Sequence, residues 1–315
     1  MSTENQEEQN QQAAPAATVT KTYDLSKESD LVALIRDESD DDAVKKQIAA
    51  HVESIFNKHK LSGYRLVLLY DEASTINQFH SNRLYEAVSD VAKKENILLF
   101  LVSDGGKIEP AYLIGKTCKR LSKNKFVVVV PRRAKSAATL ISLGASEIHM
   151  GFLSELGPID PQFGGFPALG LANALEKIAS LSAKFPNSAE MFAKYLTSNL
   201  NIRDLGYFER INESAAQYAQ RLLDGKTFPD GKTAEFLADH FTNHYKDHGF
   251  VIDADEAARL LGKTIVKENS KEYEFSNELY VFLQFADLIF QVFKKKTMRY
   301  VGSIEGGLDL NDVKK

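Results

Sequence analysis

A serine stands where a predicted buried strand gives way to a predicted helix. Residues 126–130 are consecutive apolar residues, which predicts a strand buried on both faces, and Pro131 ends the run. A second apolar run extends from Ser136 to Leu143 and stops at Gly144, a residue type that often ends helices. Unpaired N–H groups at a helix start favour an oxyanion, so Ser136 is a candidate nucleophile. An ordinary helix N-cap is the alternative interpretation.

Two glycines follow the preceding predicted strand. The apolar residues 97–102 lead into Ser103, Asp104, Gly105 and Gly106, and a predicted helix comes next. A glycine pair lets the backbone approach another group closely, although a plain tight turn is the alternative. If the two turns converge, the serine hydroxyl faces main-chain donors, which is the arrangement of a nucleophile and an oxyanion hole.

Three segments of the chain resemble the serine dehydrogenase proteinase family of the Clp-protease/crotonase superfamily, which is related to signal peptide peptidase A. They are VSDGGKIEPAYLIGK (102–116), VVVVPRRAKSAATLISLGASEIHMG (127–151) and LGPIDPQFGGFPA (156–168). The last is similar to the family's Leu-Gly-Pro-(Ile/Val)-Asp-Pro-Gln element, and the likeness covers roughly residues 64–179. The resemblance implies acyl transfer, in which Ser136 attacks a peptide carbonyl and the N–H groups of Gly105 or Gly106 and of Ala137 hold the oxyanion.

Two residue types, an aspartate and a lysine, are candidates for the general base. The resemblance places Asp160 close to the position where the Clp peptidase subunit carries its catalytic histidine. A carboxylate with the usual pKa of about 3.9 is a weak base unless burial raises that pKa. We therefore expect Asp160 to shape the loop or contact substrate at least as often as to take a proton.

A lysine is the other candidate base, because relatives of the signal-peptide-peptidase type use a Ser–Lys dyad. Lys177 lies 41 positions after Ser136 (177 − 136), and Lys184 lies 48 positions after it (184 − 136). A desolvated lysine can act as a base, whereas a solvated helix face is the alternative for both residues. Lys135 is expected to point away from its neighbour, because adjacent helix positions do not share a face.

The elements that must position these residues alternate between strand and helix. Apolar strands are predicted at 64–70, 97–102 and 126–130, with a helix after each, which indicates an α/β fold with a mostly parallel sheet. In such folds the site lies beyond the carboxyl ends of the strands, where both special turns are expected. The resemblance narrows the fold to a crotonase/Clp-protease-like spiral of ββα units with a helical C-terminal region.

The expected organisation has four parts. A disordered tail (1–23) precedes the α/β core with the site (24–184), a helical C-terminal region (185–300) and a second tail (301–315). Within the C-terminal region, residues 248–252 match a His-Gly-(Tyr/Phe)-x-Ile element that family members carry. An aromatic, apolar helix at 277–296 must be buried on its own domain or against another subunit, and the resemblance favours a homo-oligomer.

Several other side chains are considered for a chemical role. His149 is more often a histidine satisfied by a neighbour than a base, and Cys118 falls on an apolar stripe that predicts a buried thiol. His240 and His244 share a helix face, but no third zinc ligand is evident, so no metal site is expected. Neither a dinucleotide-binding glycine turn nor a pyridoxal-phosphate lysine context is found, so no cofactor is expected.

Composition restricts the partners. The 315-residue chain has a net charge of −4 at pH 7, which gives no reason to expect nucleic acid as a partner. No apolar run reaches the roughly 18 residues that a membrane span needs, and the N-terminus lacks the pattern of a signal peptide, so a cytoplasmic protein is expected.

The residues and the resemblance together predict a cytoplasmic serine endopeptidase that acts on a protein or peptide. The alternative is a catalytically inactive crotonase-like scaffold that binds a peptide, an acyl ligand or a protein partner. The aspartate at position 160, where a histidine would complete the usual triad, is the feature that keeps this alternative open.

Overall fold

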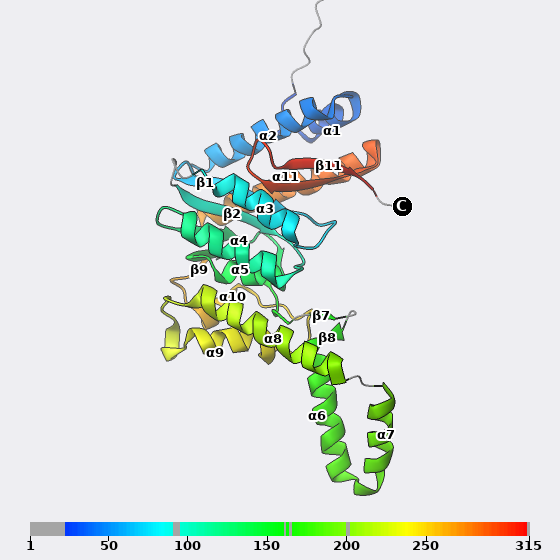
Figure 1. Cartoon of the computed structure of the whole chain (residues 1–315). Helices are drawn as coiled ribbons and strands as arrows, with labels where there is room; N and C mark the ends of the chain where they lie inside the picture. Colours follow the sequence, from blue (N-terminus) through cyan, green and yellow to red (C-terminus); the bar gives the residue numbers. More distant parts are fainter. Residues whose placement is uncertain (1–22, 91–94, 161, 164–165, 200–201, 314–315) are drawn as a thin grey trace, which may run out of the picture.

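The computed structural model describes residues 23–90, 95–160, 162–163, 166–199 and 202–313. A seven-stranded sheet runs through the molecule (Figure 1). Its strands are β1 (Tyr64–Tyr70), β2 (Asn96–Val102), β3 (Phe126–Val129), β5 (Glu147–Met150), β9 (Val266–Glu268), β10 (Lys296–Gly302) and β11 (Leu308–Asp312). The spatial order is β11-β10-β1-β2-β3-β5-β9; β1, β2, β3, β5 and β9 are parallel, and β10 and β11 run antiparallel at one edge.

Helices cover both faces of this sheet, which is why its central strands are continuous apolar runs. One face carries α3 (Gln78–Val88), α4 (Ile108–Leu121) and α5 (Ala137–Leu143), packed on alternate strand residues such as Val67 and Leu99. The other face carries α1 (Glu28–Asp37), α2 (Asp41–Lys58) and α11 (Lys271–Lys294), packed on Leu68 and Phe100. The alternation of side chains along each strand therefore divides the core into two layers.

A second row of short strand contacts runs beside the main sheet. Ile76 bridges to Gly106, Ser103 bridges to Ala134, and β4 (Arg133–Ala134) pairs in parallel with β6 (Glu155–Leu156). Each of β1, β2 and β3 is therefore followed by a short extended stretch and then by a helix. This repeated ββα order confirms the predicted spiral fold of the crotonase/Clp-protease type.

The chain end is not the tail that the sequence predicted for residues 301–315. β10 pairs antiparallel with β1, with Leu68 opposite Gly302, and β11 pairs with β10. Lys295, in the left-handed conformation, ends α11 and turns the chain back into β10. Met298 and Tyr300 alternate inward and are fully buried, so this strand belongs to the core.

The predicted boundary at residue 184 does not separate the sheet from the later part of the chain. β9, β10, β11 and α11 all come after this point and complete the sheet and one of its faces. The predicted apolar helix at 277–296 corresponds to α11, whose Leu279, Leu283 and Phe290 are buried in this chain's own core. The expected N-terminal tail lies outside the described residues except for Tyr23.

The remaining elements lie below the sheet in Figure 1. They are β7 (Gln162–Phe163), β8 (Phe166–Pro167), α6 (Ala168–Lys184), α7 (Ala189–Asn199), α8 (Ile202–Leu223), α9 (Ala234–Asp239), a π-helical turn (His240–His244) and α10 (Ala254–Leu261). α6 and α7 form a hairpin that projects away from the rest of the chain. None of the helices in the described ranges has the length and apolar character to cross a membrane.

Candidate active site

Ser136 occupies a strained turn between β4 and α5. Its backbone has φ 49° and ψ −116°, a region that costs a non-glycine residue about 1–3 kcal/mol. α5 begins at Ala137, yet the serine side chain makes no capping hydrogen bond to the helix. The conformation therefore does not suit the N-cap alternative, and the hydroxyl is left available for other chemistry.

The diglycine turn lies directly against the serine turn. A Cβ atom built on Gly105 would lie 2.8 Å from the Cβ of Ser136 and 3.1 Å from the N atom of Ala137. Gly105 also has φ +106°, which L side chains rarely adopt, so only glycine fits the contact. The two turns that the sequence singled out thus converge, as the predicted oxyanion hole requires.

The main-chain donors at this contact are not equivalent. The Gly105 N–H donates to Ser103 Oγ at 3.1 Å. The neighbours of Gly106 on both sides bond to Ile76: the Ile76 N–H donates to the Gly105 carbonyl, and the Lys107 N–H donates to the Ile76 carbonyl, both at 2.8 Å. In such a parallel bridge the N–H of the middle residue, Gly106, points away from Ile76. Within the described residues, no hydrogen bond is found for the N–H groups of Gly106 and Ala137. Of the two glycines considered, Gly106 is therefore the one with a free donor.

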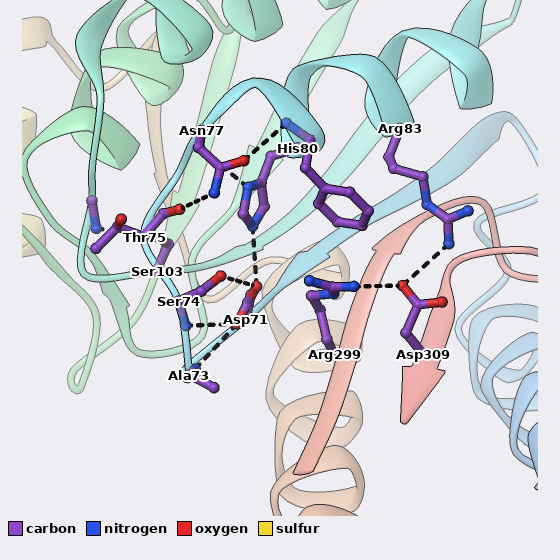
Figure 2. A network of polar contacts seen from close by, with 12 residues as sticks. Asp71, Ala73, Ser74, Thr75, Asn77, His80, Arg83, Ser103, Arg299 and Asp309 are labelled. Carbon is purple, nitrogen blue, oxygen red and sulfur yellow. Dashed lines mark hydrogen bonds and ion pairs between the residues drawn. The ribbon is translucent and has the colours of Figure 1, made fainter. Parts of the chain in front are cut away.

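A buried polar network holds the loop that ends at Ile76 (Figure 2). The Asp71 carboxylate accepts bonds from the N–H groups of Ala73 and Ser74 at 3.1 and 2.9 Å, from the Ser74 hydroxyl at 2.6 Å and from His80 Nε2 at 3.1 Å. His80 Nδ1 accepts the Asn77 N–H at 3.2 Å, which fixes the imidazole as the tautomer that donates to Asp71.

This network determines the charge of Asp71. Burial alone would raise the pKa of this carboxyl group, but the bonds from His80 and Ser74 outweigh that effect and lower the pKa. Asp71 is 2% exposed, whereas residues 72–75 of the same loop are exposed. Its neighbour Glu72 forms an ion pair with Arg133 at 2.7 Å. Asp71 is thus a structural anchor for the loop that clamps Gly106.

Asp160 is fully buried and pairs with a histidine that the sequence did not place in the site. His248 Nδ1 donates to Asp160 Oδ1. The main chain brings these residues together, because Leu156 and Ile252 exchange two antiparallel hydrogen bonds at 2.9 and 3.1 Å. The signal that could have indicated this pairing was the His-Gly-Phe-Val-Ile stretch at 248–252, which stood without a structural partner in the sequence.

The candidate lysines lie in different surroundings. Lys177 is exposed on α6, in the hairpin that projects from the rest of the chain, and Lys184 is exposed at the end of the same helix (Figure 1). Lys135 forms an ion pair with Glu155 at 2.8 Å and donates to the Phe250 carbonyl at 3.2 Å. Its side chain is thus committed away from the serine, as predicted.

The other candidates belong to the framework. His149 is buried on β5, and its Nδ1 shares a hydrogen bond with Ser270 Oγ at 2.6 Å, whereas within the described residues its Nε2 has no hydrogen-bond partner and lies 3.4 Å from Glu147 Oε2. Cys118 is buried as predicted, and burial raises the pKa of its thiol to about 12. His240 and His244 stack at 4.1 Å, and within the described residues no cluster of three or more side chains could hold a metal ion.

Comparison with known proteins finds one matching family and several similar proteins. Residues 55–185 match the family described as ClpP-like SDH-type serine proteinase, a range that includes both turns and Asp160.

Two proteins of Methanocaldococcus jannaschii, the uncharacterized proteins MJ0137 and MJ1495, are similar over shorter stretches. The first is 35% identical over 97 residues, 31% of this chain and 34% of that protein. The second is 42% identical over 52 residues, 16% of this chain and 18% of that protein. The similarity thus spans about a third of these relatives or less.

Two solved structures are also similar, both of the 1510-N membrane-bound stomatin-specific protease. A mutant in complex with a substrate peptide is 13% identical with a TM-score of 0.40, over 80% of this chain and 87% of that one. A second mutant is 14% identical, again with a TM-score of 0.40, over 79% of this chain and 91% of that one.

Proposed function

We propose that the chain is a serine peptidase with Ser136 as its nucleophile, because residues 55–185 match the family described as ClpP-like SDH-type serine proteinase. The observation that carries the proposal is the contact between the two turns. Gly105 lies so close to Ser136 and Ala137 that no side chain fits between them. The strained serine and the Ala137 N–H therefore lie directly against the diglycine turn, and within the described residues neither the Ala137 nor the Gly106 N–H has a hydrogen-bond partner.

The proposed reaction is acyl transfer to the serine. The Ser136 oxygen attacks the carbonyl carbon of a peptide bond, and the negative charge that develops on the carbonyl oxygen is held by the N–H groups of Gly106 and Ala137. The positive end of the α5 helix adds to this stabilisation. Removing one such donor typically costs about 3 kcal/mol of transition-state stabilisation.

The proton of the serine needs an acceptor, and the sequence offered Asp160 and Lys177 for this role. Asp160 is buried beside the strand pair that follows β6, where it is held by His248. Lys177 is exposed on α6, so a role as base requires it to come to the serine by movement of the hairpin or from another copy of the chain. Asp160 and its partner are therefore the preferred proton-handling group.

The competing proposal is a non-catalytic scaffold. It is favoured by one observation: within the described residues, the Ser136 hydroxyl forms no hydrogen bond with a base. In such a protein the same turns would bind a peptide or an acyl group through the free N–H groups without covalent chemistry.

A fluorophosphonate probe separates the two proposals, because it reacts covalently only with an activated serine. The peptidase predicts labelling of the wild-type protein that disappears in Ser136→Ala. Ser146→Ala, an exposed serine just beyond the other end of α5, is the matched control and should be labelled normally. Absence of labelling in the folded wild-type protein contradicts the peptidase and favours the scaffold.

The predicted homo-oligomer and the predicted cytoplasmic location remain proposals. Half-exposed apolar side chains on α11, Val281, Leu288 and Val292, support a contact with another copy. Native mass spectrometry of the full chain tests the first proposal, since a monomer at every concentration contradicts it. Fractionation of the source cells tests the second.

A further inference from the structure

The pairing of Asp160 with His248 has the form of a catalytic proton relay. The carboxylate is 1% exposed, whereas the imidazole side chain is 31% exposed. The Nδ1 atom of the histidine donates to Asp160, so in the neutral ring Nε2 carries the lone pair and accepts protons. A buried carboxylate that fixes this tautomer is what orients a histidine base in serine hydrolases.

A backbone bridge holds together the two segments that carry this pair. Leu156 and Ile252 are directly opposite each other in an antiparallel bridge. Asp160 lies four residues after Leu156, and His248 lies four residues before Ile252 in a turn closed by the Phe250 N–H and the Asp247 carbonyl at 3.0 Å. The contact joins residues that are 88 positions apart in the sequence. The bridge between Leu156 and Ile252 already holds the main chains of their two segments together.

The two segments joined by the Leu156–Ile252 bridge also border the serine turn. β6 pairs in parallel with β4, which leads directly into Ser136. Gly157 N donates to Thr139 Oγ1 at 2.9 Å in the first turn of α5, and Lys135 reaches the Phe250 carbonyl at 3.2 Å. Both segments that carry the Asp160–His248 pair are thus anchored to residues within three positions of the nucleophile.

Chemistry favours the imidazole over the other candidates. A histidine side chain ordinarily titrates near pH 6.5, close to the pH at which a peptidase works, whereas a carboxylate ordinarily titrates near pH 3.9 and a lysine near pH 10.4. By side-chain type, an imidazole is therefore better suited than a carboxylate or an amine to accept the serine proton.

We propose that His248 is the general base of Ser136 and that Asp160 is its positioning residue, an assignment that rests on the proposed peptidase. The bond between Ser136 Oγ and the carbonyl carbon forms while the hydroxyl proton passes to His248 Nε2 and the carbonyl π electrons move to oxygen. Collapse of the intermediate breaks the C–N bond, and the imidazolium returns its proton to the leaving amine. Water then takes the place of the amine and repeats the steps to release the acid. Within the described residues, no hydrogen bond joins these two side chains, so the proposal requires His248 Nε2 to come within hydrogen-bond distance of Ser136 Oγ when substrate binds.

Chemical rescue tests this assignment on the full-length protein. His248→Ala is expected to slow fluorophosphonate labelling of Ser136 by about 100-fold or more, and added imidazole to restore the rate by about tenfold or more. His244→Ala, on the exposed end of the same region, is the matched control and keeps the wild-type rate with no response to imidazole. Asp160→Asn alone is expected to slow labelling of Ser136. Added to His248→Ala, it should cause no further loss of the labelling rate, because the pair acts as one unit.

The other possible labelling results overturn either the base assignment or the peptidase itself. Labelling of His248→Ala at the wild-type rate, or a loss that imidazole does not restore, overturns the assignment of the base. Loss of labelling in Lys177→Met together with normal labelling in His248→Ala transfers the role to the lysine. A wild-type protein that the probe does not label overturns the proposed peptidase itself, which is a different failure.

Discussion

At the scale of single residues, the proposed site depends on backbone conformations that few side chains tolerate. Ser136 is a non-glycine residue at positive φ, and the facing Gly105 has φ +106°. The glycine pair and the strand–serine–helix pattern were enough to predict this meeting from the sequence. His248 was not predicted as part of the site, because its partner lies 88 positions away and no local pattern encodes such a contact.

Gly105→Ala tests how closely the two turns must approach. The added Cβ would lie 2.8 Å from Ser136 Cβ and 2.9 Å from the Lys135 carbonyl oxygen, so the turns must separate. We expect a loss of about 1–3 kcal/mol in the free energy of unfolding and a large loss of probe labelling. Gly63→Ala is the control, since its Cβ would meet nothing within 4 Å, and it should label normally. Normal labelling of Gly105→Ala would contradict the geometry of the oxyanion hole.

The Asp71 network makes a prediction about pH. The folded-state pKa of Asp71 lies below its ordinary value, since burial raises it but the bonds from His80 and Ser74 lower it by more. A carboxyl group whose pKa is lower in the folded than in the unfolded state stabilises the fold at pH values above its unfolded pKa of about 3.9. This contribution is lost as the pH falls through the folded-state pKa.

Asp71→Asn should therefore cost about 1–3 kcal/mol near pH 6, the scale of hydrogen bonds to a charged group. The difference from the wild type should shrink below about pH 4, where the wild-type carboxyl group is itself protonated. Urea unfolding between pH 3 and pH 6 measures this. A difference that is the same at every pH would show that the carboxylate charge is not what the network stabilises.

At the scale of elements, the sequence was informative where apolar patterns are strong and local. β1, β2, β3 and α5 lie within a residue or two of their predicted bounds, because buried parallel strands are unbroken apolar runs. β10 and β11 were missed for the opposite reason. Residues 296–302 and 308–312 alternate apolar with charged or polar side chains, and only pairing with β1 gives that alternation a buried side.

Truncation after Lys295 distinguishes an edge hairpin from a tail. Removing β10 and β11 exposes the main-chain edge of β1 and uncovers buried residues such as Leu68, so we expect an insoluble or unfolded protein. Truncation after Val313 keeps all of β10 and β11 and is the control. A soluble, cooperatively melting protein that ends at Lys295, as judged by circular dichroism, would support a tail instead.

At the scale of the whole molecule, one sheet organises both halves of the sequence. The segment 55–185 supplies the central strands and the two special turns, while later segments supply α11, both edges of the sheet and the histidine that pairs with Asp160. The sequence predicted the fold and the position of the nucleophile but divided the chain too sharply, because contacts across more than 80 positions leave no periodic trace. The α6–α7 hairpin stands apart from this frame (Figure 1).

The central claim is that Ser136 faces an oxyanion hole built from the Gly106 and Ala137 N–H groups. A crystal structure of the protein after reaction with a fluorophosphonate tests it most directly. We predict phosphorus bonded to Ser136 Oγ, with one phosphonyl oxygen about 2.7–3.1 Å from both nitrogen atoms. A phosphonate on another serine, or one on Ser136 whose oxygens turn to solvent, contradicts the claim.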